Sequence, residues 1–180
     1  IEPARGNVPL AAGYLHLYAR RRGLESAYDI EILPPVLANR LGDQGLVEAI
    51  LGRDPWLVGF TCYLWNVERT LHVATALRAR RPGLRVLVGG PEITPDNAWV
   101  LESPVVDLAV FGEGEATFAE LLAALQTGEA QPGSIPGLYV APAGPRLPRP
   151  RRPARRKASA KGFPSGPNAA ASECSPSRRS

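Results

Sequence analysis

The sequence predicts an α/β domain with a doubly wound, mainly parallel sheet between two layers of helices. Near-continuous apolar runs at 57–63, 85–88 and 106–111 are typical of strands that are buried on both faces. Segments with apolar residues at helical spacing alternate with these runs, and this order favours right-handed βαβ crossovers. We therefore expect three layers, α/β/α, in a Rossmann-like or flavodoxin-like arrangement.

The first predicted element is a helix at 9–23, with an Arg run near its carboxyl end, where cations suit the helix dipole. Its apolar positions are Leu10, Tyr14, Leu17 and Tyr18. No strand precedes this helix, although the alternation requires one and the first strand of a doubly wound sheet is normally central. We therefore expect a strand and its loop before Ile1, so that this sequence lacks the first strand of the fold. The alternating run YDIEIL at 28–33 predicts a strand with one wetter face.

Three further helices and one strand complete the predicted domain, which we place at residues 1–140. Apolar residues at helical spacing follow a capping Asp43, a capping Asn66 and the glycine-rich turn after residue 111. Each of these stripes can cover one face of the sheet. The run IPGLYV at 135–140 predicts a short last strand.

The carboxyl-terminal part of the chain differs sharply from this domain. Residues 1–145 contain 16 acids and 11 Arg, a net charge of −5, whereas residues 146–180 contain ten bases and one acid, a net charge of +9. The basic segment has no Ile or Val and cannot bury enough apolar surface to offset its ordering entropy. We predict a disordered basic tail at 141–180. Because its Arg residues lack interleaved aromatics for base stacking, no nucleic-acid partner is predicted.

The cysteine content and the hydropathy of the sequence argue against disulfide-rich, metal-cluster and membrane proteins. Cys62 lies in an apolar run and Cys174 in the basic tail, so the two thiols predict neither a disulfide framework nor a metal cluster. The sequence contains no apolar run of 18 residues and no signal peptide, so we predict no membrane partner and, by default, a cytoplasmic setting.

Three distinctive turns follow the predicted parallel strands: TCYLWN, GGPE and GEGEATF. Ligands of such folds bind beyond the carboxyl ends of the strands, so we expect these turns to share one edge and to form a binding site. The candidate cofactor-binding residues are Thr61, Tyr63, Trp65, Asn66, Gly89, Gly90, Pro91, Glu92, Gly112, Glu113, Gly114 and Glu115. Most of them are polar but uncharged, and neither a catalytic residue nor a metal ligand is predicted.

The chemistry of the glycine turns favours a large ligand without an exposed pyrophosphate. The Gly-Gly turn allows a flat ligand to approach the backbone, because glycine has no Cβ. We expect Gly90→Trp to fill this groove and abolish binding without unfolding the domain. Glu113 and Glu115, at a helix amino end, would repel the phosphate that commonly binds there, so this turn suits amide donors better. Ordinary helix capping also accounts for both carboxylates, and this alternative stays open.

At these residues the sequence resembles the cobalamin-binding domain that precedes the catalytic barrel in B12-dependent radical S-adenosylmethionine (SAM) proteins. The likeness covers about residues 7–140. It rests on a Pro-Leu-x-x-Gly-Tyr-Leu segment, a Thr-x-Tyr-x-Trp-Asn turn, a Gly-Gly-Pro-Glu turn and a Gly-Glu-Gly-Glu-x-x-Phe stretch, at residues 9–15, 61–66, 89–92 and 112–118, with Asp107 before the last. The resemblance implies that cobalamin is the cofactor, with the Gly-Gly turn against its nucleotide tail and the loop at 61–66 nearer the corrin ring.

Two departures limit what the resemblance implies. The lower-ligand motif Asp-x-His-x-x-Gly is absent, and neither His16 nor His72 is expected to bind cobalt. The Cys-x-x-x-Cys-x-x-Cys run that ligates a [4Fe–4S] cluster is absent too. The resemblance therefore implies a binding module whose partner is the radical SAM barrel of a longer parent, with the cluster and SAM confined to that barrel and no turnover by this chain. A nucleotide- or dinucleotide-binding domain of an unrelated enzyme is the alternative, although the third glycine of the dinucleotide fingerprint is missing.

Overall fold

A computed structural model of the chain describes residues 9–127 and 132–142. Its centre is a four-stranded sheet in the order β1-β2-β3-β4. The strands are β1 (Leu57–Thr61), β2 (Arg85–Gly89), β3 (Leu108–Val110) and β4 (Leu138–Val140). The first three strands are parallel, as predicted, whereas β4 is antiparallel to β3. Leu138, the first residue of β4, pairs with Val110 at the end of β3, and Val140 pairs with Leu108, so β4 runs back along β3.

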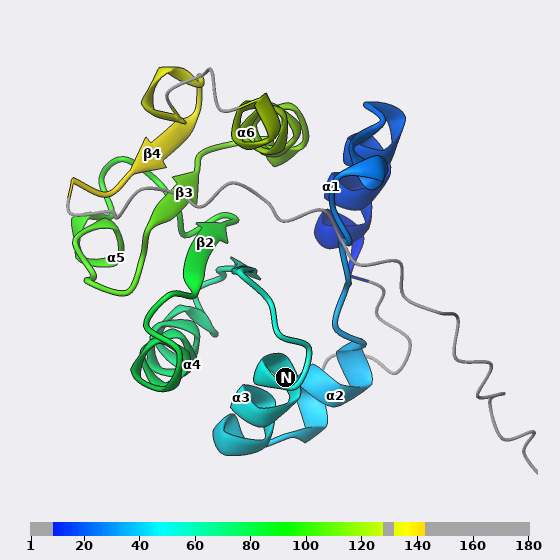
Figure 1. The fold of residues 1–180 in the computed structure, drawn as a ribbon. Coiled ribbons are helices and arrows are strands. Elements are labelled where there is room, and N and C mark those ends of the chain that lie inside the picture. Colours follow the sequence, from blue (N-terminus) through cyan, green and yellow to red (C-terminus); the bar gives the residue numbers. More distant parts are fainter. Residues whose placement is uncertain (1–8, 128–131, 143–180) are drawn as a thin grey trace, which may run out of the picture.

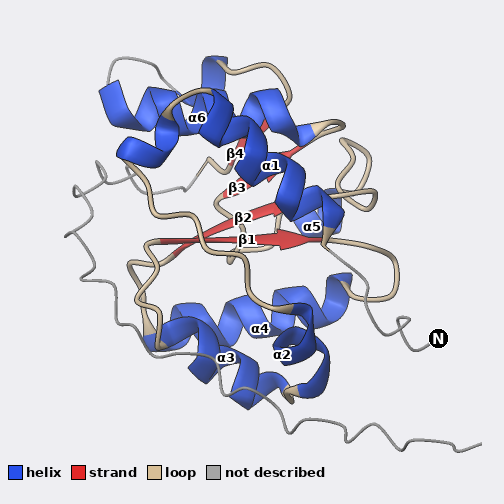
Figure 2. Cartoon of the chain, turned by 90° about the vertical axis from the view of Figure 1, so that its right-hand side faces the viewer, coloured by secondary structure: helices blue, strands red, loops and turns tan. Residues whose placement is uncertain are grey.

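Helices cover both faces of the sheet, which confirms the α/β prediction. Helices α1 (Leu10–Arg21) and α6 (Gly114–Thr127) pack together on one face. On the other face lie α3 (Asp43–Leu51), α4 (Val67–Arg80) and the short α5 (Ala98–Leu101), with α2 (Pro35–Arg40) beside α3. Figure 2 shows α1 and α6 above the sheet and α2, α3 and α4 below it. Two 3-10 turns, Leu24–Ser26 and Pro132–Ser134, follow α1 and precede β4 (Figure 1).

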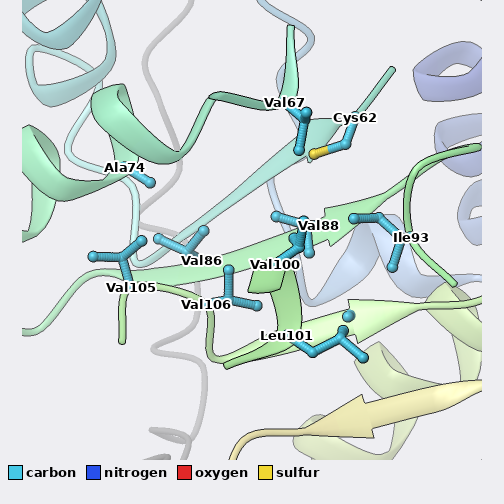
Figure 3. Packing of buried hydrophobic residues seen from close by; sticks show 11 residues of the cluster. Cys62, Val67, Ala74, Val86, Val88, Ile93, Val100, Leu101, Val105 and Val106 are labelled. Atoms are coloured by element: carbon cyan, nitrogen blue, oxygen red, sulfur yellow. The ribbon is translucent and has the colours of Figure 1, made fainter. Parts of the chain in front are cut away.

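The strand side chains alternate between these two layers, as the period of a strand requires. Val86 and Val88 of β2 pack with α4 and α5, whereas Leu87 between them packs with α6. Figure 3 shows the first of these clusters, in which Cys62, Val67, Val88 and Ile93 gather near the carboxyl ends of the strands. The turns that follow β1 and β2 therefore rest on a packed apolar core.

A buried ion cluster lies at the other end of the sheet, where β2 and β3 begin. The carboxylate of Asp107, directly before β3, accepts a hydrogen bond from the backbone N–H of Val86 at 2.8 Å. It also pairs with the guanidinium groups of Arg78 on α4 and Arg85 on β2. One side chain thus ties two strands and a helix together, at the edge away from the predicted binding turns.

Two local predictions are wrong. Residues 28–33 form no strand, because a strand needs a hydrogen-bonded neighbour and, in the described part of the chain, β1 pairs only with β2. Asp43 is the first residue of α3 and not its cap, a position that Gly42 takes. The Asp43 carboxylate accepts a hydrogen bond from Arg69 on α4 at 2.7 Å, so its role is to join two helices.

The predicted basic tail lies outside the described residues, apart from residues 141 and 142. The boundary at residue 140 therefore stays a prediction. Within the described ranges, no helix combines the length and the apolar character needed to cross a lipid bilayer.

Candidate functional site

The three predicted turns meet at one edge of the sheet. Thr61 at the end of β1 pairs with Gly89 at the end of β2, and Gly89 pairs in turn with Val110 at the end of β3. Because the three strands are parallel and end in register, the segments 62–66, 90–92 and 111–115 all emerge at their carboxyl ends. The predicted convergence of the turns is confirmed, and we refer to these three segments with Thr61 and Gly89 as the rim.

The first segment of the rim is a loop held by the side chain of Asn66. Its Oδ1 accepts a hydrogen bond from the Tyr63 backbone N–H at 2.8 Å, and its Nδ2 donates to the Thr61 carbonyl at 3.1 Å. Asn66 occupies the N-cap position of α4, as predicted, but makes no side-chain cap hydrogen bond. Since both ends of its amide are engaged within the loop, Asn66 shapes the loop.

That loop presents a stacked aromatic pair to solvent. The rings of Tyr63 and Trp65 lie 4.7 Å apart and 7° from parallel. Trp65 is 79% exposed and Leu64 77% exposed, although large apolar side chains are normally buried. The outer face of the indole is therefore a flat apolar platform on the rim.

In the second segment, the two glycines have different roles. Gly90 has φ of +110°, and a Cβ there would lie 2.6 Å from the Cys62 carbonyl oxygen and 3.1 Å from Thr61 Cγ2. Gly90 is thus required for the backbone to close, and the expectation that Gly90→Trp would leave the domain folded is wrong. A Cβ at Gly89 would meet only ordinary contacts with Val110, the nearest at 3.8 Å. Pro91 is exposed and Glu92 half-buried, and the Glu92 backbone is held by Cys62 and Asn97.

The third segment opens helix α6 as predicted. Gly112 has φ of +68°, and a Cβ there would meet no atom within 4 Å. A Cβ at Gly114, by contrast, would lie 3.3 Å from Leu15 Cδ2 on α1. Gly114 therefore serves the close packing of α6 against α1. Glu113 is exposed and precedes the helix, and Glu115 is half-buried in its first turn, where carboxylates suit the free backbone N–H groups.

A cavity of about 260 Å³ adjoins the rim, between the start of α1 and the end of β1. It is lined by Pro9, Leu10, Ala11, Ala12, Thr61 and Tyr63. The candidate residue set contains only the last two, because it was drawn from the turns that follow predicted strands, whereas the first four lie at the start of α1. The motif Pro-Leu-x-x-Gly-Tyr-Leu at residues 9–15 is the sequence signal that could have found them.

Neither Cys62 nor either histidine is placed to ligate cobalt from the rim. Cys62 is fully buried and faces the core, and burial raises the pKa of its thiol to about 11. His72 is largely exposed on α4, 3.9 Å from the Asp43 carboxylate, and His16 lies in the middle of α1. Among the described residues, no three His, Cys, Asp or Glu side chains are grouped as a metal site.

These features suit a large, flat, amide-bearing ligand. Gly89 leaves the backbone accessible, Trp65 offers an apolar face, and the hydroxyls of Thr61 and Tyr63 supply neutral polar groups beside the cavity. Glu113 and Glu115 add acceptors for amide N–H groups. A pyrophosphate, by contrast, would meet two carboxylates at the helix end where anions usually bind.

Comparison with known proteins agrees with this chemistry. A family model described as the B12 binding domain matches residues 7–122. The chain is 33% identical over 157 residues to the "Cobalamin-dependent radical SAM methyltransferase TokK" of Streptomyces tokunonensis, covering 79% of this chain and 22% of that protein. It is 35% identical over 136 residues to the "2-(S-pantetheinyl)-carbapenam-3-carboxylate methyltransferase" of Streptantibioticus cattleyicolor, covering 74% and 19%. The chain thus spans about a fifth of the length of these relatives.

One solved structure supports the fold. The apo structure of the cobalamin-dependent S-adenosylmethionine radical enzyme OxsB aligns with a TM-score of 0.57 at 19% identity, covering 76% of this chain and 18% of that one. At this identity the likeness concerns the arrangement of strands and helices.

Proposed function

Because the chain belongs to the B12-binding domain family, with cobalamin as its cofactor, we propose that the rim is the surface that holds this cofactor. The observation that supports this assignment is the register of β1, β2 and β3, which brings all three turns to one edge. Carboxyl ends of parallel strands are where ligands of open α/β sheets bind. The residues proposed to form the cofactor site remain those predicted from the sequence, with the cavity-lining residues 9–12 added.

The rim offers groups of two chemical kinds, and we assign them to the two parts of the cofactor. Cobalamin combines a wide corrin with amide side chains and a nucleotide tail with a phosphate. The exposed indole of Trp65 and the acceptors Glu113 and Glu115 suit the corrin and its amides. The tail fits better at Gly89, where backbone is accessible without a Cβ in the way.

Within this assignment Gly90 and Asn66 are positioning residues. Gly90 lets the second segment pack on Cys62, and Asn66 holds the loop that presents Tyr63 and Trp65. Neither needs to touch the cofactor for its replacement to weaken binding.

We further propose that the parent protein is a radical SAM enzyme, as the names of the two curated relatives suggest. The catalytic barrel would supply the iron–sulfur cluster and bind SAM, and it would be the protein partner of this module. Cobalamin supplies a cobalt centre that can carry a methyl group, and the residues described here bind and orient it. This chain, which has no Cys-x-x-x-Cys-x-x-Cys run, should bind the cofactor without turnover.

Retention of corrin absorption tests the proposal. Purified chain is mixed with hydroxocobalamin, passed through a desalting column and compared with the same chain mixed with a nicotinamide dinucleotide. We expect the corrin spectrum to elute with the protein and the dinucleotide to elute separately. The opposite result, with circular dichroism showing a folded chain, would support the dinucleotide-binding alternative instead.

A further inference from the structure

Helix α1 turns most of its apolar side chains away from the core. Within this helix only Ala19 is buried, where it packs against α6. At about 100° per residue, Leu10 and Leu17 lie on the opposite side of the helix from Ala19, with Tyr14 beside them. Leu10 is 63% exposed, Tyr14 56% and Leu17 54%, and we refer to these three residues as the α1 stripe. A helix that is apolar on two opposite sides is normally covered on both.

Gly13 lies within this stripe. Because neighbours on a helix surface are three and four residues apart, Gly13 is flanked by Leu10 and Leu17. A Cβ at Gly13 would meet nothing within 4 Å, so packing inside the described domain does not require a glycine there. Glycine inside a helix also weakens the helix relative to alanine. A gap between two exposed leucines suits instead a side chain of another element that approaches the backbone of α1 closely.

No described element covers the α1 stripe. Helix α1 packs mainly against α6, and Figure 1 shows it at the right of the described chain, with α6 and the sheet on its left. At one end of the stripe, Leu10 lines the cavity together with Thr61 and Tyr63. Leu17 lies about 10 Å further along the helix, at 1.5 Å per residue. The stripe is therefore continuous with the rim but extends well beyond it.

From these features we propose that the α1 stripe docks against an apolar surface of the catalytic part of the parent protein. The identity of this occupant rests on the proposed function, whereas the need for an occupant rests on α1 alone. The matched segment makes up 22% and 19% of the two curated relatives, so about four-fifths of each relative lies outside it. Proteins of this kind thus carry ample further chain to supply the opposing surface.

The size of the stripe favours an occupant on the same polypeptide. Three side chains that are little more than half exposed offer roughly 300 Å² of surface, whereas a stable interface between separate proteins buries about 800 Å² on each partner. A covalently joined partner needs less area, because the linkage holds it at a high effective concentration. A second copy of this chain, which lacks such a linkage, is therefore disfavoured.

Charge at one end of the stripe adds to the description of the occupant. Arg21 follows Leu17 by four residues on the same side of α1, is exposed and, among the described residues, pairs with no carboxylate. The docked surface should therefore place an acidic side chain near Arg21. An anionic lipid surface would also suit this cation, but residues 1–145 carry a net charge of −5, which opposes attraction to such a surface.

Site-specific photocrosslinking in the full-length parent tests the proposal. The photoreactive residue benzoylphenylalanine replaces Leu17 in one variant and Tyr14 in a second, in which one aromatic ring replaces another and folding is least disturbed. The matched control carries it at Ala79, which is exposed on α4, on the other face of the sheet. After irradiation, we expect peptides of the catalytic part to be joined to positions 14 and 17 and none to be joined to position 79.

The substitution Leu17→Gln separates docking from folding. Because Leu17 is exposed and glutamine is a good helix former, the isolated chain should keep its urea midpoint and its hydroxocobalamin affinity. In the parent, we expect limited proteolysis between this module and the catalytic part to become about tenfold faster, because cleavage follows the undocked population and burial of one Leu side chain shifts that population by this order. Ala79→Gln is the control and should leave cleavage unchanged.

Three outcomes would overturn the proposal. One is a folded parent in which positions 14 and 17 crosslink only within this module or to nothing. Another is crosslinking between two copies together with a dimer in sedimentation equilibrium, which would make a second copy the occupant. The third is flotation of the isolated chain with phosphatidylserine vesicles that Leu17→Gln abolishes, which would make the occupant a lipid surface. Corrin retention is a separate measurement, so a chain that crosslinks without binding hydroxocobalamin refutes only the proposed function.

Discussion

Gly90 lies so close to Cys62 that a Cβ at Gly90 would be 2.6 Å from the Cys62 carbonyl oxygen and 3.0 Å from its nitrogen. Both contacts are with backbone, and Gly90 also has φ of +110°. We therefore expect Gly90→Ala to destabilise the domain by at least about 1–3 kcal/mol, the usual cost of a non-glycine residue in a strained conformation. Urea unfolding measures this. Gly13→Ala is the matched control, because a Cβ at Gly13 meets nothing within 4 Å.

Replacement of Gly89 distinguishes a role in cofactor binding from a role in folding. A Cβ at Gly89 has room against Val110, with no atom closer than 3.8 Å, so Gly89→Ala should keep the urea midpoint of the unsubstituted chain. If the nucleotide tail approaches this backbone, the added methyl group will block it, and we expect hydroxocobalamin affinity to fall at least about tenfold. Equilibrium dialysis gives the affinity. Unchanged binding by a stably folded Gly89→Ala chain would remove the Gly-Gly turn from the cofactor site.

Trp65 and Leu64 form a second matched pair, since they are neighbours in one loop and almost equally exposed. Trp65 is stacked on Tyr63 and offers a flat face, whereas Leu64 has no such partner. We expect Trp65→Ala to weaken hydroxocobalamin binding several-fold and Leu64→Ala to leave it unchanged, because stacking surface is lost only in the first variant. Equal losses in both variants would mean that general apolar exposure of the loop, and not the indole platform, contributes to binding.

The sequence predicts the framework of this domain well, because its signals are local. The runs that became β1, β2 and β3 are mainly apolar, and parallel strands place their following turns at one end of the sheet by geometry alone. The candidate residues therefore meet as expected. Sequence also predicts the helices that carry an apolar stripe, including α4 and α6.

What sequence could not give depends on contacts between distant elements. The Cys62 backbone lies so close to Gly90 that a side chain there would clash, whereas a Cβ at Gly89 has room. No local sequence pattern encodes this difference between the two glycines. The failure of residues 28–33 to form a strand reflects the lack of a pairing neighbour, not a weak pattern. Likewise, Asp107 reads as part of a motif beside the binding turns, but it lies at the amino-terminal edge and pairs with two Arg.

The cluster around Asp107 should dominate the polar contribution to stability. Asp107 and Arg85 are both buried, and removal of one partner leaves a buried charge without compensation. We expect Asp107→Ala to lower the free energy of unfolding by about 3–5 kcal/mol, the cost typical of breaking a buried ion pair. Urea unfolding at neutral pH provides the measurement.

The control for Asp107 is Glu25→Ala, which removes an exposed pair with Arg20. Exposed pairs contribute less than about 1 kcal/mol, so this variant should unfold close to the natural chain. Should Asp107→Ala and Glu25→Ala unfold at the same urea concentration, the buried cluster would have no special role. If Asp107→Ala does not fold at all, Asp107→Asn, which keeps an acceptor for the Val86 N–H, should recover a folded chain.

The Cys62 thiol should remain unreactive in the native domain. It is fully buried, and burial raises its pKa from 9.0 to about 11, although a hydrogen bond with Thr70 acts in the opposite direction. Only thiolates react readily with disulfide reagents, so a Cys174→Ser chain, which retains Cys62 alone, should label slowly at pH 8 and rapidly in urea. Rapid labelling without denaturant would contradict the burial of Cys62.

The same burial predicts that the domain loses stability at alkaline pH. In the unfolded chain the thiol releases its proton near pH 9, whereas the folded chain retains it up to about pH 11. Since the unfolded state then binds fewer protons than the native state, the free energy of unfolding should fall as pH rises from about 9 to about 11. Tyr28, whose pKa burial raises from 10.0 to about 12, extends this decline to higher pH. In Cys62→Ala the slope between pH 9 and 10 should become shallower, because the thiol no longer contributes to it. An unaltered slope would assign the alkaline transition to other groups.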